Sequence, residues 1–155
     1  MNKFNSHKQF ETHALKKVIG RKFYLNNITD DGQVGKIAEE KLFGKVAAPG
    51  QADYFIKNKA EELKVYSANA IHILTSKSKH KIKQKAADKM RRSSLLYYEK
   101  SNNVVTFKIM YRLFNMNEKL FKKRINIRKN KHQQFEGNIT LTRLEESFDC
   151  INEVA

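Results

Sequence analysis

Residues 32–67 read GQVGKIAEEKLFGKVAAPGQADYFIKNKAEELKVYS, and the apolar and charged residues of this stretch follow a regular pattern. Within it, Glu39, Asp53 and Glu62 recur around one lysine, Lys64. The chain as a whole is strongly basic, with 31 Lys and Arg residues against 16 Asp and Glu residues. Acidic residues gathered in a basic chain raise the question of which structure brings them together and for what purpose.

The spacing of apolar residues over 33–43 predicts a helix. Either Asp30 or Asp31 is its expected N-cap, and the glycine that follows the last turn is expected to end it. Residues 53–56 and 61–66 read as two short strands that pair as a hairpin across a polar turn. The opening stretch therefore predicts a helix followed by a β-hairpin.

The two-residue period of a strand decides which side chains of the second strand share a face. Glu62 and Lys64 lie on one face, about 7 Å apart along the strand, and Leu63 and Val65 lie on the other. The apolar face belongs to the core. Asp53 opens the neighbouring strand and is expected opposite Glu62 and Lys64.

Helical spacing separates the two glutamates of the preceding helix. Glu40 stacks on Lys36 as an ordinary solvated pair. Glu39 instead borders the apolar stripe, and we expect it to tilt inward. Carboxylate oxygens at one edge of a sheet suit Mg²⁺, and a nearby ammonium stabilises charge that develops on phosphorus. The residues alone thus indicate a metal-assisted phosphodiesterase, with a surface hairpin of cross-strand ion pairs as the alternative.

The formal net charge of +15 favours a polyanionic partner, because each neutralised phosphate releases condensed counterions. The positive charge is concentrated in residues 77–92 and 119–131. Neither run has the large apolar face of a helix that binds a membrane surface, so no membrane partner is expected. Nucleic acid is the expected partner, and the alternative is a solvated basic surface.

Length and composition indicate a globular protein. The 155 residues, of which 40% are hydrophobic, are enough for one domain with a core. No apolar run approaches the ~20 residues that cross a bilayer, and the N-terminal residues lack the apolar region of a signal peptide. The single cysteine, Cys150, excludes an internal disulfide and a CxxC-type zinc site. These features predict a cytoplasmic protein.

The rest of the chain predicts further elements around one sheet, in an α/β or α+β fold. The expected helices are 7–18, 79–92, 116–129 and 143–154, and the expected strands are 70–74, 93–99, 104–111 and 138–142. We expect a single domain over 1–155, with a catalytic core at about 30–110 and a DNA-contacting part at 111–155.

Other residues that could take part in binding or catalysis do not form a recognisable motif. The five histidines are scattered without metal-ligand spacing. Ser93 and Ser94 follow two arginines, where they either contact phosphate or start a strand. Tyrosines at 97, 98 and 111 either stack on bases or belong to the core.

The residues of the opening stretch also follow the order of a known nuclease motif. That motif has a Gly-x-x-Gly helix start, a glutamate four residues later, a leucine and glycine at the helix end, an aspartate before an aromatic residue, and Glu-Leu-Lys. A basic residue late in a helix before a strand completes it. The matching positions here are Gly32, Gly35, Glu39, Leu42, Gly44, Asp53, Tyr54, Glu62, Leu63, Lys64 and Lys89. In this respect the chain resembles the MutH mismatch-repair endonucleases and related GATC-cutting type II restriction enzymes, which belong to the PD-(D/E)xK nuclease superfamily.

The resemblance implies a restriction-endonuclease-like fold, with a mixed central sheet flanked by helices, and Mg²⁺-dependent hydrolysis of double-stranded DNA, with Mn²⁺ as a substitute metal. Asp53, Glu62 and the main-chain carbonyl of Leu63 would hold the metal, and Glu39 would hold a second metal or its water. Lys64 would stabilise the attacking hydroxide. Lys89 would contact the scissile phosphate.

The resemblance is specific over residues 32–66 and faint to about residue 98. The turn between Asp53 and Glu62 is slightly longer than in the family, the expected proline stands at Pro49, and the chain is shorter than the repair enzyme. The cleavage sequence therefore stays open, as does the choice among a monomer, a homodimer and a complex with a partner protein. Two alternatives remain: a basic nucleic-acid-binding protein without catalysis, and an RNA-cutting nuclease on the same scaffold.

Overall fold

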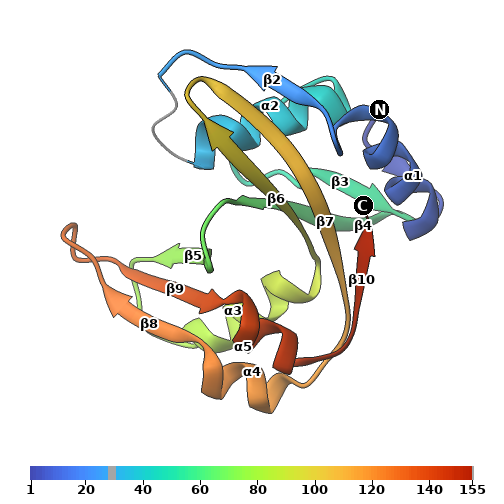
Figure 1. Cartoon of the computed structure of the whole chain (residues 1–155). Coiled ribbons are helices and arrows are strands. Elements are labelled where there is room, and N and C mark those ends of the chain that lie inside the picture. Colours follow the sequence, from blue (N-terminus) through green and yellow to red (C-terminus); the bar gives the residue numbers. More distant parts are fainter. Residues whose placement is uncertain (28–30, 155) are drawn as a thin grey trace. The chain divides into compact units, whose positions relative to one another are not determined.

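The computed structural model describes residues 1–27 and 31–154, with side chains described for all of these except 149–153. The chain divides into two compact units. The first unit comprises residues 1–67, 93–112 and the last residues from 153. The second unit comprises residues 68–92 and 113–152, so it is built from two segments that interrupt the first unit along the sequence. The fold is mixed α+β (Figure 1).

A curled mixed sheet lies mostly in the first unit (Figure 1). Its strands, in spatial order, are β1 (Lys3–Phe4), β3 (Tyr54–Ile56), β4 (Lys59–Tyr66), β6 (Ser93–Ser101), β7 (Val104–Met116) and β10 (Phe148–Val154), and β2 (Lys22–Tyr24) also pairs with β7. The β1–β3 and β4–β6 pairs are parallel, whereas β3–β4, β6–β7 and β2–β7 are antiparallel. The predicted hairpins of residues 53–66 and 93–111 are both confirmed.

Helices α1 (His7–Lys17) and α2 (Asp31–Phe43) bury their apolar stripes in the core of this unit. The core residues of α2 include Val34, Ala38 and Leu42, which recur at helical spacing. Stacked and edge-to-face rings of Phe4, Phe10, Phe43 and Tyr54 fill the space between the helices and the sheet. The predicted helices 7–18 and 33–43 are confirmed.

Local signals fix where these helices begin and end. The Ser6 hydroxyl accepts a hydrogen bond from the Gln9 amide at 3.1 Å and so caps α1. Gly44 ends α2 with a φ of 78°, and its amide bonds to the Glu40 carbonyl at 2.9 Å. Asp31 is the first residue of α2, whereas the alternative N-cap, Asp30, lies outside the described residues.

A tight two-residue turn joins β3 to β4. Lys57 and Asn58 both have positive φ, at 50° and 66°, which is the conformation of a type I′ hairpin turn. The register places Tyr54 opposite Glu61 and Phe55 opposite Ala60. This hairpin positions the acidic residues discussed below.

The second unit has a sheet of its own, so the expectation of one sheet is wrong. Strands β5 (Ala70–Ser76), β9 (Phe135–Thr140) and β8 (Asn126–Lys129) form this antiparallel sheet in that order. Helices α3 (Ile82–Arg91), α4 (Glu118–Arg124) and α5 (Leu141–Glu146) belong to the same unit. The predicted strand at 70–74 exists, but its partner is β9, more than sixty residues later in the chain.

Two further expectations in this unit are corrected. The helix expected over 116–129 ends at Arg124, because Ile125 turns extended and residues 126–129 pair with β9. The closing helix expected over 143–154 is α5 only, and the chain continues from Phe148 as strand β10. In both places a strand partner distant in sequence overrides the local helical pattern.

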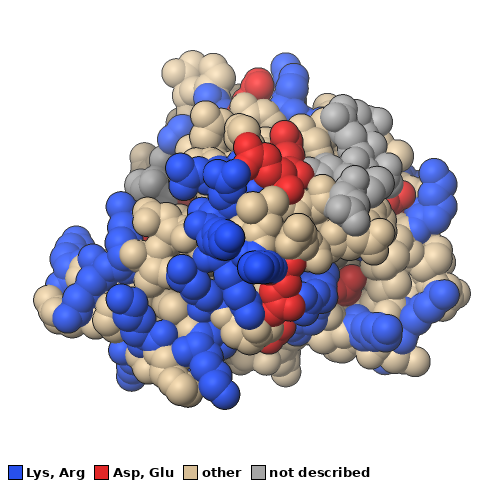
Figure 2. Space-filling view, turned by 90° about the horizontal axis from the view of Figure 1, so that it is seen from below, with Lys and Arg blue, Asp and Glu red and all other residues tan. Residues whose placement is uncertain are grey.

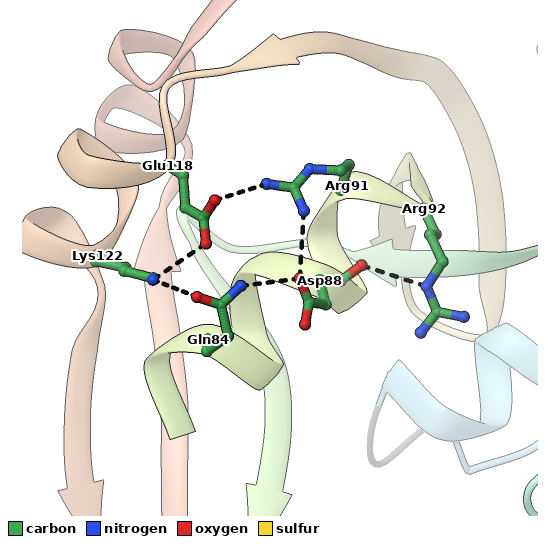
Figure 3. A network of polar contacts seen from close by, with 6 residues as sticks. All are labelled: Gln84, Asp88, Arg91, Arg92, Glu118 and Lys122. Atoms are coloured by element: carbon green, nitrogen blue, oxygen red, sulfur yellow. Dashed lines mark hydrogen bonds and ion pairs between the residues drawn. The ribbon is translucent and has the colours of Figure 1, made fainter. Parts of the chain in front are cut away.

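Exposed ion pairs link α3 to α4 (Figure 3). Arg91 bonds to Asp88 at 3.2 Å on its own helix and to Glu118 of α4 at 3.1 Å. Lys122 bonds to Glu118 at 3.0 Å and also donates to the side-chain carbonyl of Gln84. Several basic side chains of the second unit are thus already held by acidic or polar partners.

No helix within residues 1–27 and 31–154 combines the length and the apolar character that a membrane-crossing helix requires.

Candidate functional site

Two glutamates of the first unit, Glu39 and Glu62, lie within side-chain hydrogen-bonding reach of Asp53. Glu39 comes from α2, Asp53 stands immediately before β3, and Glu62 lies on β4. All three side chains are half-buried. Both Glu39 and Glu62 are close enough to Asp53 to alter its protonation through side-chain hydrogen bonds.

The main chain of the hairpin holds Asp53 in place. The Leu63 amide donates to Asp53 Oδ2 at 2.7 Å, and the Asp53 amide donates to the Glu61 carbonyl at 3.2 Å. Glu39 is held more loosely, because its Oε1 accepts from the Ala47 amide at 3.3 Å. Asp53 is therefore the fixed centre of this carboxylate cluster, which we define as Glu39, Asp53 and Glu62.

The surroundings of Asp53 disfavour its negative charge. Burial, followed by a hydrogen bond with Glu39 and the charge of that residue, raises the pKa of Asp53 to about 6. The Leu63 amide and Glu62 act in the opposite direction but do not overcome these effects. Asp53 therefore carries its negative charge less readily than an ordinary aspartate does, and a cation placed beside it would offset the repulsion from Glu39.

The donor set fits a hard divalent cation. Carboxylate oxygens are the ligands that Mg²⁺ takes from proteins, with water and phosphate oxygens completing the octahedron. In the part of the chain that the structure describes, however, no three His, Cys, Asp or Glu side chains stand together at metal-ligand spacing. A cation would therefore have to draw the three carboxyl groups of the cluster closer together.

Lys64 lies on the same face of β4 as Glu62, as predicted, because the two residues are separated by one strand period. Leu63 and Val65 face the other way and pack against the core. Lys64 is half-buried and stands opposite Leu95 of β6, a fully buried residue. The strand therefore presents an ammonium and a carboxylate on the side of the sheet away from α1 and α2.

Ser93 joins this face through the parallel pairing of β4 with β6. Its register partner is Glu62, and its side chain is buried. The sequence offered phosphate contact and a strand start as alternatives for Ser93, and the strand start is confirmed. Its neighbour Glu62 was not foreseen, since the register follows from a long crossover between the two strands that carries no local signal.

Lys89 belongs to the second unit. It lies on α3, half-buried, at the C-terminal part of that helix, as predicted. The carboxylate cluster and Lys64 lie in the first unit.

A second polar group lies in the core of the first unit, where no sequence pattern indicated one. Buried Arg112 donates to Ser94 Oγ at 2.8 Å and to the ring of His7, and Ser94 Oγ bonds to the Tyr54 hydroxyl at 2.7 Å. Burial, Arg112 and Lys57, in that order, lower the pKa of His7 to about 4. His7 is therefore neutral at physiological pH and accepts from the arginine.

Basic side chains gather on the surface, with few acidic side chains among them on the face in Figure 2. The second unit contributes a basic groove of about 680 Å³, whose lining includes Lys79, Lys81, Lys83 and Lys122. Such a surface attracts phosphates without reading sequence.

Comparison of the chain with known protein families, with curated proteins and with solved structures found no match.

Proposed function

We propose that this protein is a Mg²⁺-dependent DNA endonuclease of the restriction or repair type. The observation that carries the proposal is the carboxylate cluster, in which Asp53 contacts both glutamates, and burial, followed by Glu39, raises the pKa of Asp53 to about 6. A protein that only binds nucleic acid has no need to hold acidic groups together in a basic chain. A site that takes up a cation does, because the cation offsets their repulsion.

Each residue of the cluster has a role in this proposal. Asp53 and Glu62 would hold Mg²⁺ together with the main-chain carbonyl of Leu63, and Glu39 would hold a second ion or its water. When bound, the metal would supply an activated water and positive charge beside the phosphate. Lys64 would donate to the attacking oxygen and stabilise its charge. Lys89 is proposed to contact the scissile phosphate.

The proposed architecture is restriction-endonuclease-like. Its support is the order of elements: a helix with an inward glutamate, then a hairpin whose strands present Asp53 and Glu62-x-Lys64 on one face of a mixed sheet. We place the reaction in the cytoplasm, where one cysteine is expected to stay reduced. Mn²⁺ is the proposed substitute for Mg²⁺.

Double-stranded DNA is the proposed substrate. The net charge of +15 and the basic groove of the second unit supply the attraction to phosphate that such a substrate needs. The proposal leaves the cleavage sequence open.

The function is tested by incubating the full chain with plasmid and with total RNA, each in Mg²⁺ and in EDTA. We expect plasmid cleavage that requires Mg²⁺ and is lost in Lys64→Ala. The matched control is Lys59→Ala, which removes an exposed lysine from the start of the same strand.

The outcomes separate the candidate functions. Cleavage of RNA alone would indicate a ribonuclease on the same scaffold. Binding of DNA without cleavage of either substrate would indicate a nucleic-acid-binding protein, and wild-type cleavage by Lys64→Ala would show that the site is misassigned.

A further inference from the structure

A cavity of about 570 Å³ lies beside Asp53 in the first unit. This volume falls within the range of roughly 300–1,000 Å³ that is typical of small-molecule sites. The side chains that matter for its chemistry are Asn2, Lys3, Lys45, Gln51, Asp53 and Phe55. They come from β1 and the residue before it, from β3, and from the loop that joins α2 to β3.

The floor of this cavity is a row of side chains that runs across three strands. Lys3 of β1 stands beside Phe55 of β3, and Phe55 stands opposite Ala60 of β4. Their neighbours Phe4 and Ile56 are buried in the core, so the row faces the other side of the sheet. Asp53, immediately before β3, is one strand period from Phe55, and Glu62 of β4 is one strand period from Ala60. The cavity therefore shares a face of the sheet with Asp53 and Glu62 of the carboxylate cluster.

The residues around this cavity combine three kinds of recognition chemistry. Lys3 and Lys45 are exposed cations, Asn2 and Gln51 carry amides that both donate and accept, and Phe55 is a half-buried aromatic ring. A nucleotide offers a matching phosphate, base edge and base face. Because the ring needs an open base face, the base must be unpaired.

We propose that the cavity is a subsite for one nucleotide turned out of the DNA duplex and so unpaired, with its base on Phe55 and its phosphates at Lys3 and Lys45. The subsite rests on the proposed nuclease function in one respect: the bound nucleotide would flank the phosphate that is cut beside Asp53. Its binding chemistry is independent of cleavage.

Fluorescence anisotropy of the full chain in EDTA tests this subsite without hydrolysis. The probes are a short labelled oligothymidylate and an abasic oligonucleotide of the same length. Phe55→Leu keeps apolar bulk but removes the ring, so it should bind the oligothymidylate about tenfold more weakly and the abasic strand as well as the wild type does. Phe55→Tyr should restore the preference for bases.

Lys45→Ala should weaken binding of both probes, since both carry phosphates. The matched controls are Tyr24→Ala, which removes a 69% exposed ring from β2, and Lys108→Ala, which removes an exposed lysine from β7. Both controls should bind as the wild type does.

Equal losses for the two probes in Phe55→Leu, or no loss, would overturn the subsite. The nuclease function is judged separately: absence of Mg²⁺-dependent cleavage would overturn that function and leave the binding result standing. Cleavage with unchanged base preference in Phe55→Leu would overturn only the subsite.

Discussion

Asp53 holds a position that the folded chain makes unfavourable for a negative charge. Its Oδ2 accepts from the Leu63 amide at 2.7 Å, yet burial and Glu39 together outweigh that bond. An aspartate with a purely structural role would be more stable on the solvated side of the hairpin. The free energy required to charge Asp53 is what gives the metal proposal measurable consequences.

One consequence is a pH dependence of stability in the absence of metal. Because the folded-state pKa of Asp53 is raised from 3.8 to about 6, the folded chain holds a proton that the unfolded chain releases. The contribution of Asp53 to the free energy of unfolding is therefore fully present below about pH 4 and is lost as the pH rises through about 6. Urea unfolding in EDTA at several pH values should show Asp53→Asn gaining stability over the wild type across this window. A constant difference between the two proteins would contradict the assigned pKa.

His7 should produce the opposite slope. Its folded-state pKa is lowered from 6.5 to about 4, so between these values the unfolded chain binds a proton that the folded chain excludes. Its contribution to stability is present above about pH 6.5 and is lost as the pH falls toward 4. In His7→Gln, which removes the titration, the same urea series should lose stability less steeply below pH 6.5. An unchanged slope would show that His7 is accessible to protons in the folded state.

At the scale of elements, the turn between β3 and β4 sets the register that brings Asp53 to Leu63. Lys57 and Asn58 adopt positive φ there, which an L-residue does at a cost and glycine does freely. Asn58→Gly should raise the free energy of unfolding by about 0.5 kcal/mol, and Asn58→Ala should lower it, in urea titrations. A glycine variant that is less stable than the wild type would mean that the turn is not type I′ in solution.

The elements predicted from the sequence are those whose signals are local. Helix α2 ends at Gly44, the β3–β4 hairpin turns at Lys57 and Asn58, and α1 begins at Ser6, each through a residue next to the element. Strands β8 and β10 were missed because their residues fit a helical pattern when taken alone. Only pairing with strands elsewhere in the chain makes them extended.

In the candidate site, too, some positions follow from local sequence patterns and others depend on strand pairing distant in sequence. Strand alternation places Glu62 and Lys64 on one face, and helical spacing turns Glu39 inward, so these positions were predictable from periods alone. Ser93 beside Glu62, and Lys3 beside Phe55, depend on parallel pairing across long connections. No local pattern encodes such a register, so the cavity beside Asp53 was not foreseen.

Across the whole molecule, the basic residues differ in whether an acidic side chain pairs with them. Lys122 and Arg124 pair with Glu118 at 3.0 Å and Glu146 at 3.2 Å, so replacing them also disturbs α4 and its neighbours. Lys79, Lys81 and Lys83 are exposed and line the basic groove, which makes them the cleaner probes of phosphate binding.

Replacing these three lysines with glutamine should weaken DNA binding regardless of sequence. The slope of log affinity against log salt should become shallower by up to about 0.9 for each phosphate that the variant no longer neutralises. Anisotropy titrations in EDTA over a range of salt concentrations measure this slope. The matched control is a variant with glutamine in place of three exposed lysines of the first unit, Lys17, Lys22 and Lys108. An unchanged slope would remove the groove from the DNA-binding surface.

The most direct test of the carboxylate cluster as a metal site is the effect of Mg²⁺ on thermal stability. Melting curves of the wild type and of Asp53→Asn are recorded at about pH 8 in millimolar Mg²⁺ or in EDTA. A cation that binds the folded chain better than the unfolded chain raises the melting temperature by mass action. We predict a clear rise for the wild type, and for Asp53→Asn a higher melting temperature in EDTA with a blunted response to Mg²⁺. Identical responses of the two proteins to Mg²⁺, or none in either, would contradict a metal site at the carboxylate cluster.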